Sequence, residues 1–183
     1  MRWIFGIFLS VLAVPASAGA VPEALAKRIL LDPAGYVDSV AVLIAGYGAA
    51  GAIDRAGLDN VLALGRASAR AVALRRLQGA DLDGDGAVAA VEIGVTEAAS
   101  AAVTRGRLAV YFAKADGDGD GAVSAAELQA YAGAAALAAF DEARASQLRA
   151  VLGFDGNGDG RVTLDEVKAG VAALGQPPNP AKS

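Results

Sequence analysis

Three twelve-residue segments carry acidic side chains at a spacing that lets their oxygen atoms converge on one point. They are loop 2 (81–92), loop 3 (116–127) and loop 4 (155–166). Each has Asp or Asn at positions 1, 3 and 5, Gly at position 6, Val at position 8 and Glu at position 12. The glycine permits a sharp bend through a positive φ, and the final Glu closes the ring of oxygens. The pattern predicts coordination of a hard cation.

Each loop supplies five predicted ligands, namely the side chains at positions 1, 3, 5 and 12 and the backbone carbonyl at position 7. They are Asp81, Asp83, Asp85, Ala87 and Glu92; Asp116, Asp118, Asp120, Ala122 and Glu127; and Asp155, Asn157, Asp159, Arg161 and Glu166. Carboxylates about 4 Å apart repel one another by about 1 to 4 kcal/mol per pair. Three such clusters therefore favour metal sites over solvated acidic turns.

The loops closely resemble those of the EF-hand calcium-binding superfamily, and the resemblance covers about residues 35–174. It implies an all-α fold of helix-loop-helix units and three Ca²⁺ ions as cofactors. A bidentate Glu at position 12 suits calcium better than the smaller magnesium ion. A lanthanide is the rival. Exported bacterial EF-hand proteins that scavenge lanthanides typically carry proline at position 2 and a carboxylate at position 9, and neither is present in these loops.

An internal repeat extends the pattern to a fourth segment. The loop starts are 35 and 39 residues apart, and one further step back reaches loop 1 (46–57), which keeps Gly51 at position 6 and Ile53 at position 8 but lacks the early carboxylates. An ordinary glycine-rich turn is the alternative interpretation. We expect a degenerate first unit that provides a pairing partner, with Ile53 meeting Val88 and Val123 meeting Val162 in short β-pairings.

This pairing predicts two lobes. The expected organisation is a signal peptide (1–18), a lead-in (19–32), one lobe with the degenerate unit and the first site (33–98), a second lobe with the other two sites (99–174) and a disordered tail (175–183).

The first eighteen residues have the three regions of a secretory signal: Arg2, an apolar run from Trp3 to Val14, and the small-residue stretch 15–18. The run of about 12 residues is shorter than the roughly 20 that a membrane span needs. We therefore expect cleavage after Ala18 and a periplasmic or secreted protein with no membrane attachment.

Composition excludes several classes of function. The chain has no Cys and no His, which removes thiol nucleophiles, His-based general bases and ordinary zinc sites. Its formal charge of −4 disfavours nucleic acid as a partner. The carboxylates outside the three acidic loops show no paired spacing, so we expect no enzymatic activity. Asp141 and Glu142 are expected to start or charge a helix.

Two roles remain open for a calcium-binding protein of this kind. One is a calcium-stabilised binding or buffering protein. The other is a sensor that exposes an apolar groove to a partner protein or peptide. Four aromatic residues could line such a groove, although their helical spacing favours the core: Tyr111, Phe112, Tyr131 and Phe140.

Overall fold

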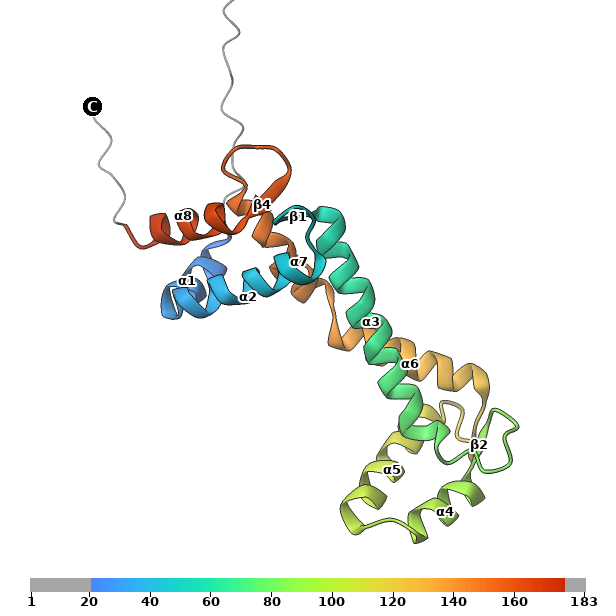
Figure 1. The fold of residues 1–183 in the computed structure, drawn as a ribbon. Coiled ribbons are helices and arrows are strands. Elements are labelled where there is room, and N and C mark those ends of the chain that lie inside the picture. Colours follow the sequence, from blue (N-terminus) through green and yellow to red (C-terminus); the bar gives the residue numbers. More distant parts are fainter. Residues whose placement is uncertain (1–20, 177–183) are drawn as a thin grey trace, which may run out of the picture. The chain divides into compact units, whose positions relative to one another are not determined.

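A computed structural model describes residues 21–176 and shows helices joined by loops and short strands (Figure 1). The elements are α1 (Glu23–Leu31), α2 (Pro33–Tyr47), β1 (Ala52–Asp54), α3 (Arg55–Gln78), β2 (Val88–Ala89), α4 (Ala90–Ala98), α5 (Ala102–Ala115), β3 (Ala122–Val123), α6 (Ala125–Ala139), α7 (Glu142–Arg149), the 3₁₀ helix η1 (Ala150–Phe154), β4 (Arg161–Thr163) and α8 (Leu164–Leu174). The predicted all-α class, with four helix-loop-helix units and short β-pairings, is confirmed. The predicted signal peptide and most of the predicted tail lie outside the described residues.

The chain divides into two compact parts. Within the described residues, the terminal domain consists of 21–54 together with 150–176, and the central domain consists of Arg55–Arg149. Two two-stranded antiparallel sheets join the loops. In the terminal domain Ile53 of β1 is the register partner of Val162 of β4, and in the central domain Val88 of β2 is the partner of Val123 of β3.

The expected pairing of consecutive loops is therefore wrong. Loop 1 pairs with loop 4 and loop 2 with loop 3, which contradicts the pairing that underlies the predicted lobes 33–98 and 99–174. The physical reason is α3, which has 24 residues without a break. At 1.5 Å per residue its ends lie about 36 Å apart. A strand that precedes this helix cannot reach one that follows it.

The core of the terminal domain forms around its strand pair. Ile53, Val162 and Val167 are fully buried, and α8 packs against α1 and α2. The ring of Tyr36 contacts that of Phe154, with their centroids 5.8 Å apart. Burial raises the pKa of Tyr36 to about 12. Asp32 caps α2 by accepting a hydrogen bond from the Gly35 N–H over 3.0 Å.

The central domain has a core beneath its loop pair. Its buried members come from α3 and the turn after it, from α4, α5 and α6, and from both strands: Leu77, Ala80, Val88, Ile93, Leu108, Ala115, Val123 and Leu128. Tyr111, Phe112 and Tyr131 pack against this cluster. The interpretation of these three aromatics as core residues is thus confirmed. Helices α3 and α6 run side by side (Figure 1).

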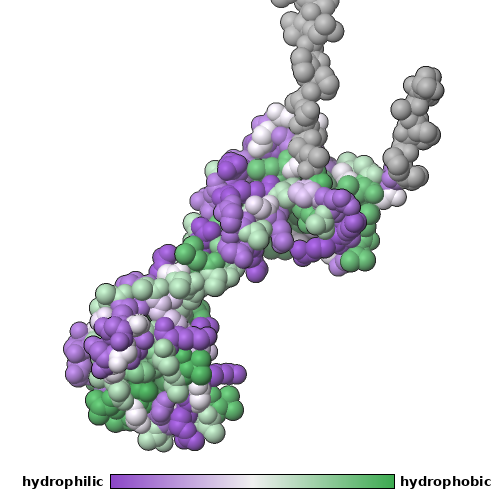
Figure 2. All heavy atoms as spheres, turned by 180° about the vertical axis from the view of Figure 1, so that it is seen from behind, coloured by the Kyte–Doolittle hydropathy of each residue, from purple (hydrophilic) through white to green (hydrophobic). Residues whose placement is uncertain are grey.

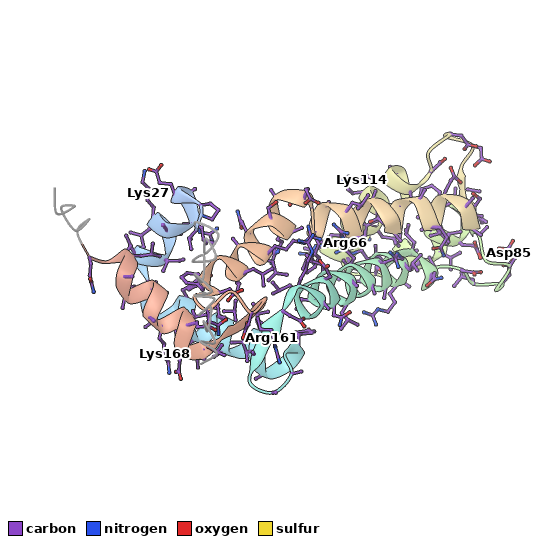
Figure 3. The ribbon with its side chains drawn as sticks, turned by 90° about the horizontal axis from the view of Figure 1, so that it is seen from above. Lys27, Arg66, Asp85, Lys114, Arg161 and Lys168 are labelled. Carbon is purple, nitrogen blue, oxygen red and sulfur yellow. The ribbon has the colours of Figure 1, made fainter. Side chains whose placement is uncertain are left out.

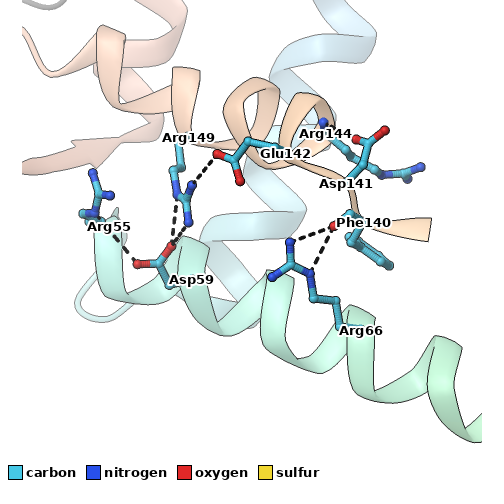
Figure 4. Close-up of polar contacts among 8 residues, drawn as sticks. All are labelled: Arg55, Asp59, Arg66, Phe140, Asp141, Glu142, Arg144 and Arg149. Atoms are coloured by element: carbon cyan, nitrogen blue, oxygen red, sulfur yellow. Dashed lines mark hydrogen bonds and ion pairs between the residues drawn. The ribbon is translucent and has the colours of Figure 1, made fainter. Parts of the chain in front are cut away.

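Polar contacts hold α3 to the segment that joins α6 and α7 (Figure 4). The Arg66 guanidinium donates two hydrogen bonds, of 2.8 and 3.0 Å, to the carbonyl oxygen of Phe140. Arg149 pairs with Asp59 on α3 over 2.9 Å. Asp141 accepts a hydrogen bond from the Arg144 N–H over 2.8 Å. Asp141 therefore caps the start of α7, as the sequence predicts.

Among residues 21–176, no single helix is long and apolar enough to cross a bilayer. Helices α1 and α2 are long and apolar enough for a span only when taken together, and the chain bends by 108° between them.

We predict opposite effects for two glycine substitutions in the packed helices of the central domain. A Cβ atom at Gly65 on α3 would overlap the Phe140 ring, whereas one at Gly133 on α6 meets no atom within 4 Å. Gly65→Ala should destabilise the fold by about 1–3 kcal/mol through overpacking. Gly133→Ala should stabilise it by about 0.5–1 kcal/mol. Denaturant unfolding of both variants measures the difference, and equal stabilisation by both would contradict the packing described.

Candidate metal sites

The predicted carboxylates come together in the structure. In loop 2, one carboxylate oxygen from each of Asp81, Asp83 and Asp85 lies within 4.8 Å of the other two, and the same holds for the three Asp of loop 3. Figure 3 shows Asp85 projecting from the tip of its loop. In loop 4 the Asn157 amide nitrogen lies 3.2 Å from an Asp159 carboxylate oxygen. Each loop gathers oxygen donors of the kind that calcium prefers.

The backbone of each acidic loop folds around its own carboxylates in the same way. The side chain at position 1 accepts hydrogen bonds from the N–H groups at position 4, over 2.7–2.8 Å, and position 6, over 2.9–3.2 Å. Position 3 accepts from the N–H at position 5, over 2.8–3.2 Å. Position 5 accepts from the N–H at position 7, over 2.8 Å. These bonds aim the three side chains inward.

Glycine is required at two positions of each acidic loop. The residues at positions 4 and 6 have φ between 75° and 87° in all three. This is the left-handed region, which favours glycine. The loop pattern described from the sequence includes only the glycine at position 6. The glycine at position 4, namely Gly84, Gly119 and Gly158, is the unrecognised half of the same bend.

The Glu at position 12 closes each loop through both of its oxygens. One accepts from the N–H at position 2, over 2.7–3.2 Å, and the other accepts from the N–H at position 9, over 2.8–2.9 Å. The first bond spans ten residues and ties the loop entrance to the exit helix. These hydrogen bonds alone hold the carboxylate at the loop. Its remaining lone pairs can coordinate a cation.

The side chain at position 9 caps the exit helix in loops 3 and 4. Ser124 accepts a hydrogen bond from the Glu127 N–H over 3.3 Å and donates one to its carboxylate over 2.8 Å. Thr163 and Glu166 repeat both contacts over the same distances. These are capping boxes at the starts of α6 and α8. The sequence signal for them is a Ser or Thr three residues before a Glu.

The hydrogen bonds lower the pKa of all three Glu side chains. The pKa of Glu127 falls from 4.5 to about 2, chiefly through the Ser124 backbone N–H and then through the Ser124 hydroxyl. The pKa of Glu92 is lowered chiefly by the Ala89 N–H and that of Glu166 chiefly by the Thr163 N–H. All three carboxylates are therefore ionised at neutral pH.

Loop 1 differs from the acidic loops in geometry as well as in composition. Helix α2 continues to Tyr47, and the chain then reverses through Ala50 and Gly51, with φ of 50° and 75°. Ala49 and Ala52 exchange backbone hydrogen bonds of 2.9 and 3.2 Å across this turn. Two positive φ values in succession define a type I′ turn. The turn brings no carboxylate to positions 1, 3, 5 or 12.

A cationic side chain from loop 4 reaches loop 1. The guanidinium of Arg161, at position 7 of loop 4, donates a hydrogen bond to the Ala49 carbonyl oxygen. The backbone N–H of Arg161 also donates to Asp159, over 2.8 Å. Figure 3 shows Arg161 beside the strand pair of the terminal domain. One residue therefore contacts both members of this loop pair.

A family model described as EF hand matches residues 108–130 and 154–172. These segments contain loops 3 and 4, each with the first part of the helix that follows it. These two segments of the chain therefore belong to the EF-hand superfamily. Loop 2 lies outside the matched segments but has the same hydrogen bonds and the same pair of positive-φ glycines as the other two acidic loops. The searches of curated proteins and of solved structures each found no significant match.

The EF-hand assignment and the acidic clusters support calcium binding and metal binding. Proteins of this superfamily typically bind calcium and are not enzymes. The described residues place the side chains of the predicted ligand set in three separate loops. They do not unite carboxylates from different loops into one site.

We predict that Ser124→Ala raises the pKa of Glu127 in the calcium-free protein, because it removes the hydroxyl donor while the backbone N–H remains. A folded-state pKa below the ordinary value means that ionised Glu127 stabilises the fold at neutral pH. This stabilisation is lost as the pH falls from 4.5 towards about 2. NMR titration of the side-chain carboxyl carbon measures the change. Glu92, whose position-9 neighbour is Ala89, is the internal control. An unchanged Glu127 titration would refute the capping contribution.

Proposed function

We propose that this EF-hand protein binds three Ca²⁺ ions, one in each acidic loop. The observation that carries the proposal is the repetition of one hydrogen-bonded loop geometry in 81–92, 116–127 and 155–166, with oxygen donors at positions 1, 3 and 5 and a position-12 Glu tied to the loop entrance. Loop 1 is not proposed as a site, because its tight turn carries no carboxylate at the ligand positions.

The three sites should differ in affinity. Loops 2 and 3 each provide four acidic ligands, whereas loop 4 provides three, because Asn157 is neutral. Loop 4 also carries a positive charge of its own, because Arg161 occupies position 7. Charge count tunes calcium affinity in these loops. We therefore expect the terminal-domain site to be the weakest of the three.

We further propose that the protein is exported and acts as a calcium-stabilised binding or buffering protein in the periplasm or outside the cell. The signal-like first eighteen residues support export. Each ion that binds the folded state at 100 times its dissociation constant stabilises the fold by about 2.7 kcal/mol. Millimolar calcium would provide this occupancy for sites with dissociation constants near 10⁻⁵ M.

A calorimetric calcium titration of the mature chain should return three sites. Glu92→Gln, Glu127→Gln and Glu166→Gln should each remove one, because the neutral amide cannot supply two anionic oxygens. Glu97→Gln, on α4 but outside the loop, is the matched control and should leave all three. Two or four sites in the parent protein, or an unchanged count in the Glu166→Gln variant, would contradict the proposal.

The sensor role is the second candidate, and one observation favours it. Val91 and Val95 on α4 are 73% and 56% exposed, and Val103 on α5 is 67% exposed. Apolar residues are also visible at the surface among hydrophilic ones in Figure 2. Exposed apolar side chains on neighbouring helices could contact a partner protein or peptide.

The two roles predict opposite responses of an apolar-surface dye. A sensor should bind more dye when calcium is added to the folded, calcium-free protein, because its helices separate. A calcium-stabilised binding or buffering protein should bind less, because calcium tightens the fold and raises its melting temperature. We expect less dye binding. A strong calcium-dependent rise in fluorescence would favour the sensor.

A further inference from the structure

The central domain has a cavity of about 350 Å³ that is separate from the acidic loops. It lies among the end of α3, the end of α4 and the first three turns of α5. Its walls include Arg76 from α3, Thr96 and Ser100 from the α4 side, and Thr104 and Arg107 from α5. The calcium-binding role proposed above uses none of these side chains.

The polar side of this cavity is cationic. Two of its lining residues are arginines and none is acidic. Within residues 21–176, neither Arg76 nor Arg107 forms an ion pair within 4.0 Å. Arg76 instead lies over the ring of Tyr111, with its guanidinium carbon 4.8 Å from the ring centroid. This contact positions the guanidinium while leaving its N–H donors available for an anion.

Hydroxyl groups and an apolar floor complete the cavity. Ser100 and Thr96 both line the cavity, and they donate their hydroxyl hydrogens to backbone carbonyls within α4, over 2.8 and 2.9 Å. The floor includes the buried side chains of Ala80 and Leu108 and the ring of Tyr111. Small-molecule sites commonly combine an apolar lining with a few polar groups, in volumes from about 300 Å³ upward.

The charge distribution of the central domain favours an anionic occupant. Residues 55–149 contain ten Lys and Arg and twelve Asp and Glu, but only four of these acids lie outside loops 2 and 3. The helical body is thus basic and the loops are acidic. Two bound calcium ions would change the net charge of this domain from −2 to +2.

We propose that this cavity binds a small organic oxyanion, with a carboxylate or phosphoryl group between Arg76 and Arg107 and an apolar body against Leu108 and Tyr111. The guanidinium group of arginine matches the oxygens of either head group. Calcium in loops 2 and 3 strengthens this binding through the change in net charge. This second statement rests on the proposed calcium function, whereas the first does not.

The test uses benzoate, phenyl phosphate and benzylamine as probes of similar size in calorimetric titrations of the full mature chain. Benzoate or phenyl phosphate should bind at a single site, and the tighter of the two identifies the head group that the cavity takes. Benzylamine, with a cationic head on a similar ring, should not bind. Absence of binding by both anions at 10 mM (about 3 kcal/mol of binding free energy), or equal binding of benzylamine, would overturn the proposal.

Matched variants locate the site. Arg76→Gln and Arg107→Gln should each weaken anion binding about tenfold, as expected for a lost charged hydrogen bond. Arg75→Gln and Arg105→Gln make the same charge change on α3 and α5 outside the cavity lining and should have little effect. All four residues are exposed, so the fold should tolerate the changes. Equal weakening by cavity and control variants would show non-specific charge attraction and reject the cavity.

Repeating the titration on the calcium-free protein separates the two proposals. Weaker anion binding without calcium supports the coupling, and equal binding rejects the coupling while leaving the cavity supported. Calcium binding itself is measured independently by its own titration, so its failure would be recognised as such.

Discussion

The continuity of α3 is the constraint on which the arrangement of the loops depends. This helix is at once the exit helix of loop 1 and the entering helix of loop 2, and its 24 residues form about 36 Å of unbroken helix. Each loop must then pair elsewhere. Loop 2 pairs with loop 3, because the chain between them breaks into the short helices α4 and α5 and can fold back. Loop 1 pairs with loop 4, which joins the two ends of the described chain in one domain.

Much of the local structure could be predicted from the sequence, because a cation-binding loop fixes residue types at fixed spacing. The bends, the inward carboxylates and the strand at position 8 all follow from that rule. The loop partners could not be predicted in the same way. The break between α4 and α5 falls in an alanine-rich segment, 97–103, that contains neither Gly nor Pro. Nothing in its composition separates it from the unbroken α3, so continuity had to be seen in the structure.

The position-12 glutamates show how one residue can serve folding and binding together. Each accepts hydrogen bonds from the N–H groups at positions 2 and 9, and in loops 3 and 4 also from the position-9 hydroxyl. These donors hold the carboxylate ionised and near the loop. The loop therefore has its entrance, its clamp and the start of its exit helix joined through one side chain. The residue type at position 12 predicts the clamp, whereas the cap depends in addition on the residue three positions earlier.

The reach of Arg161 to the Ala49 carbonyl has a consequence for the shape of a calcium-binding curve. In the terminal domain, loop 1 is contacted by the positively charged side chain of Arg161 from loop 4. This charge is part of the chain and is therefore present at every calcium concentration. Loop 4 thus has no calcium site in its partner loop that could raise its own affinity. Its occupancy should follow a simple hyperbola as the calcium concentration rises. The central domain pairs two acidic loops through β2 and β3. Any cooperative binding of calcium ions is therefore expected between loops 2 and 3.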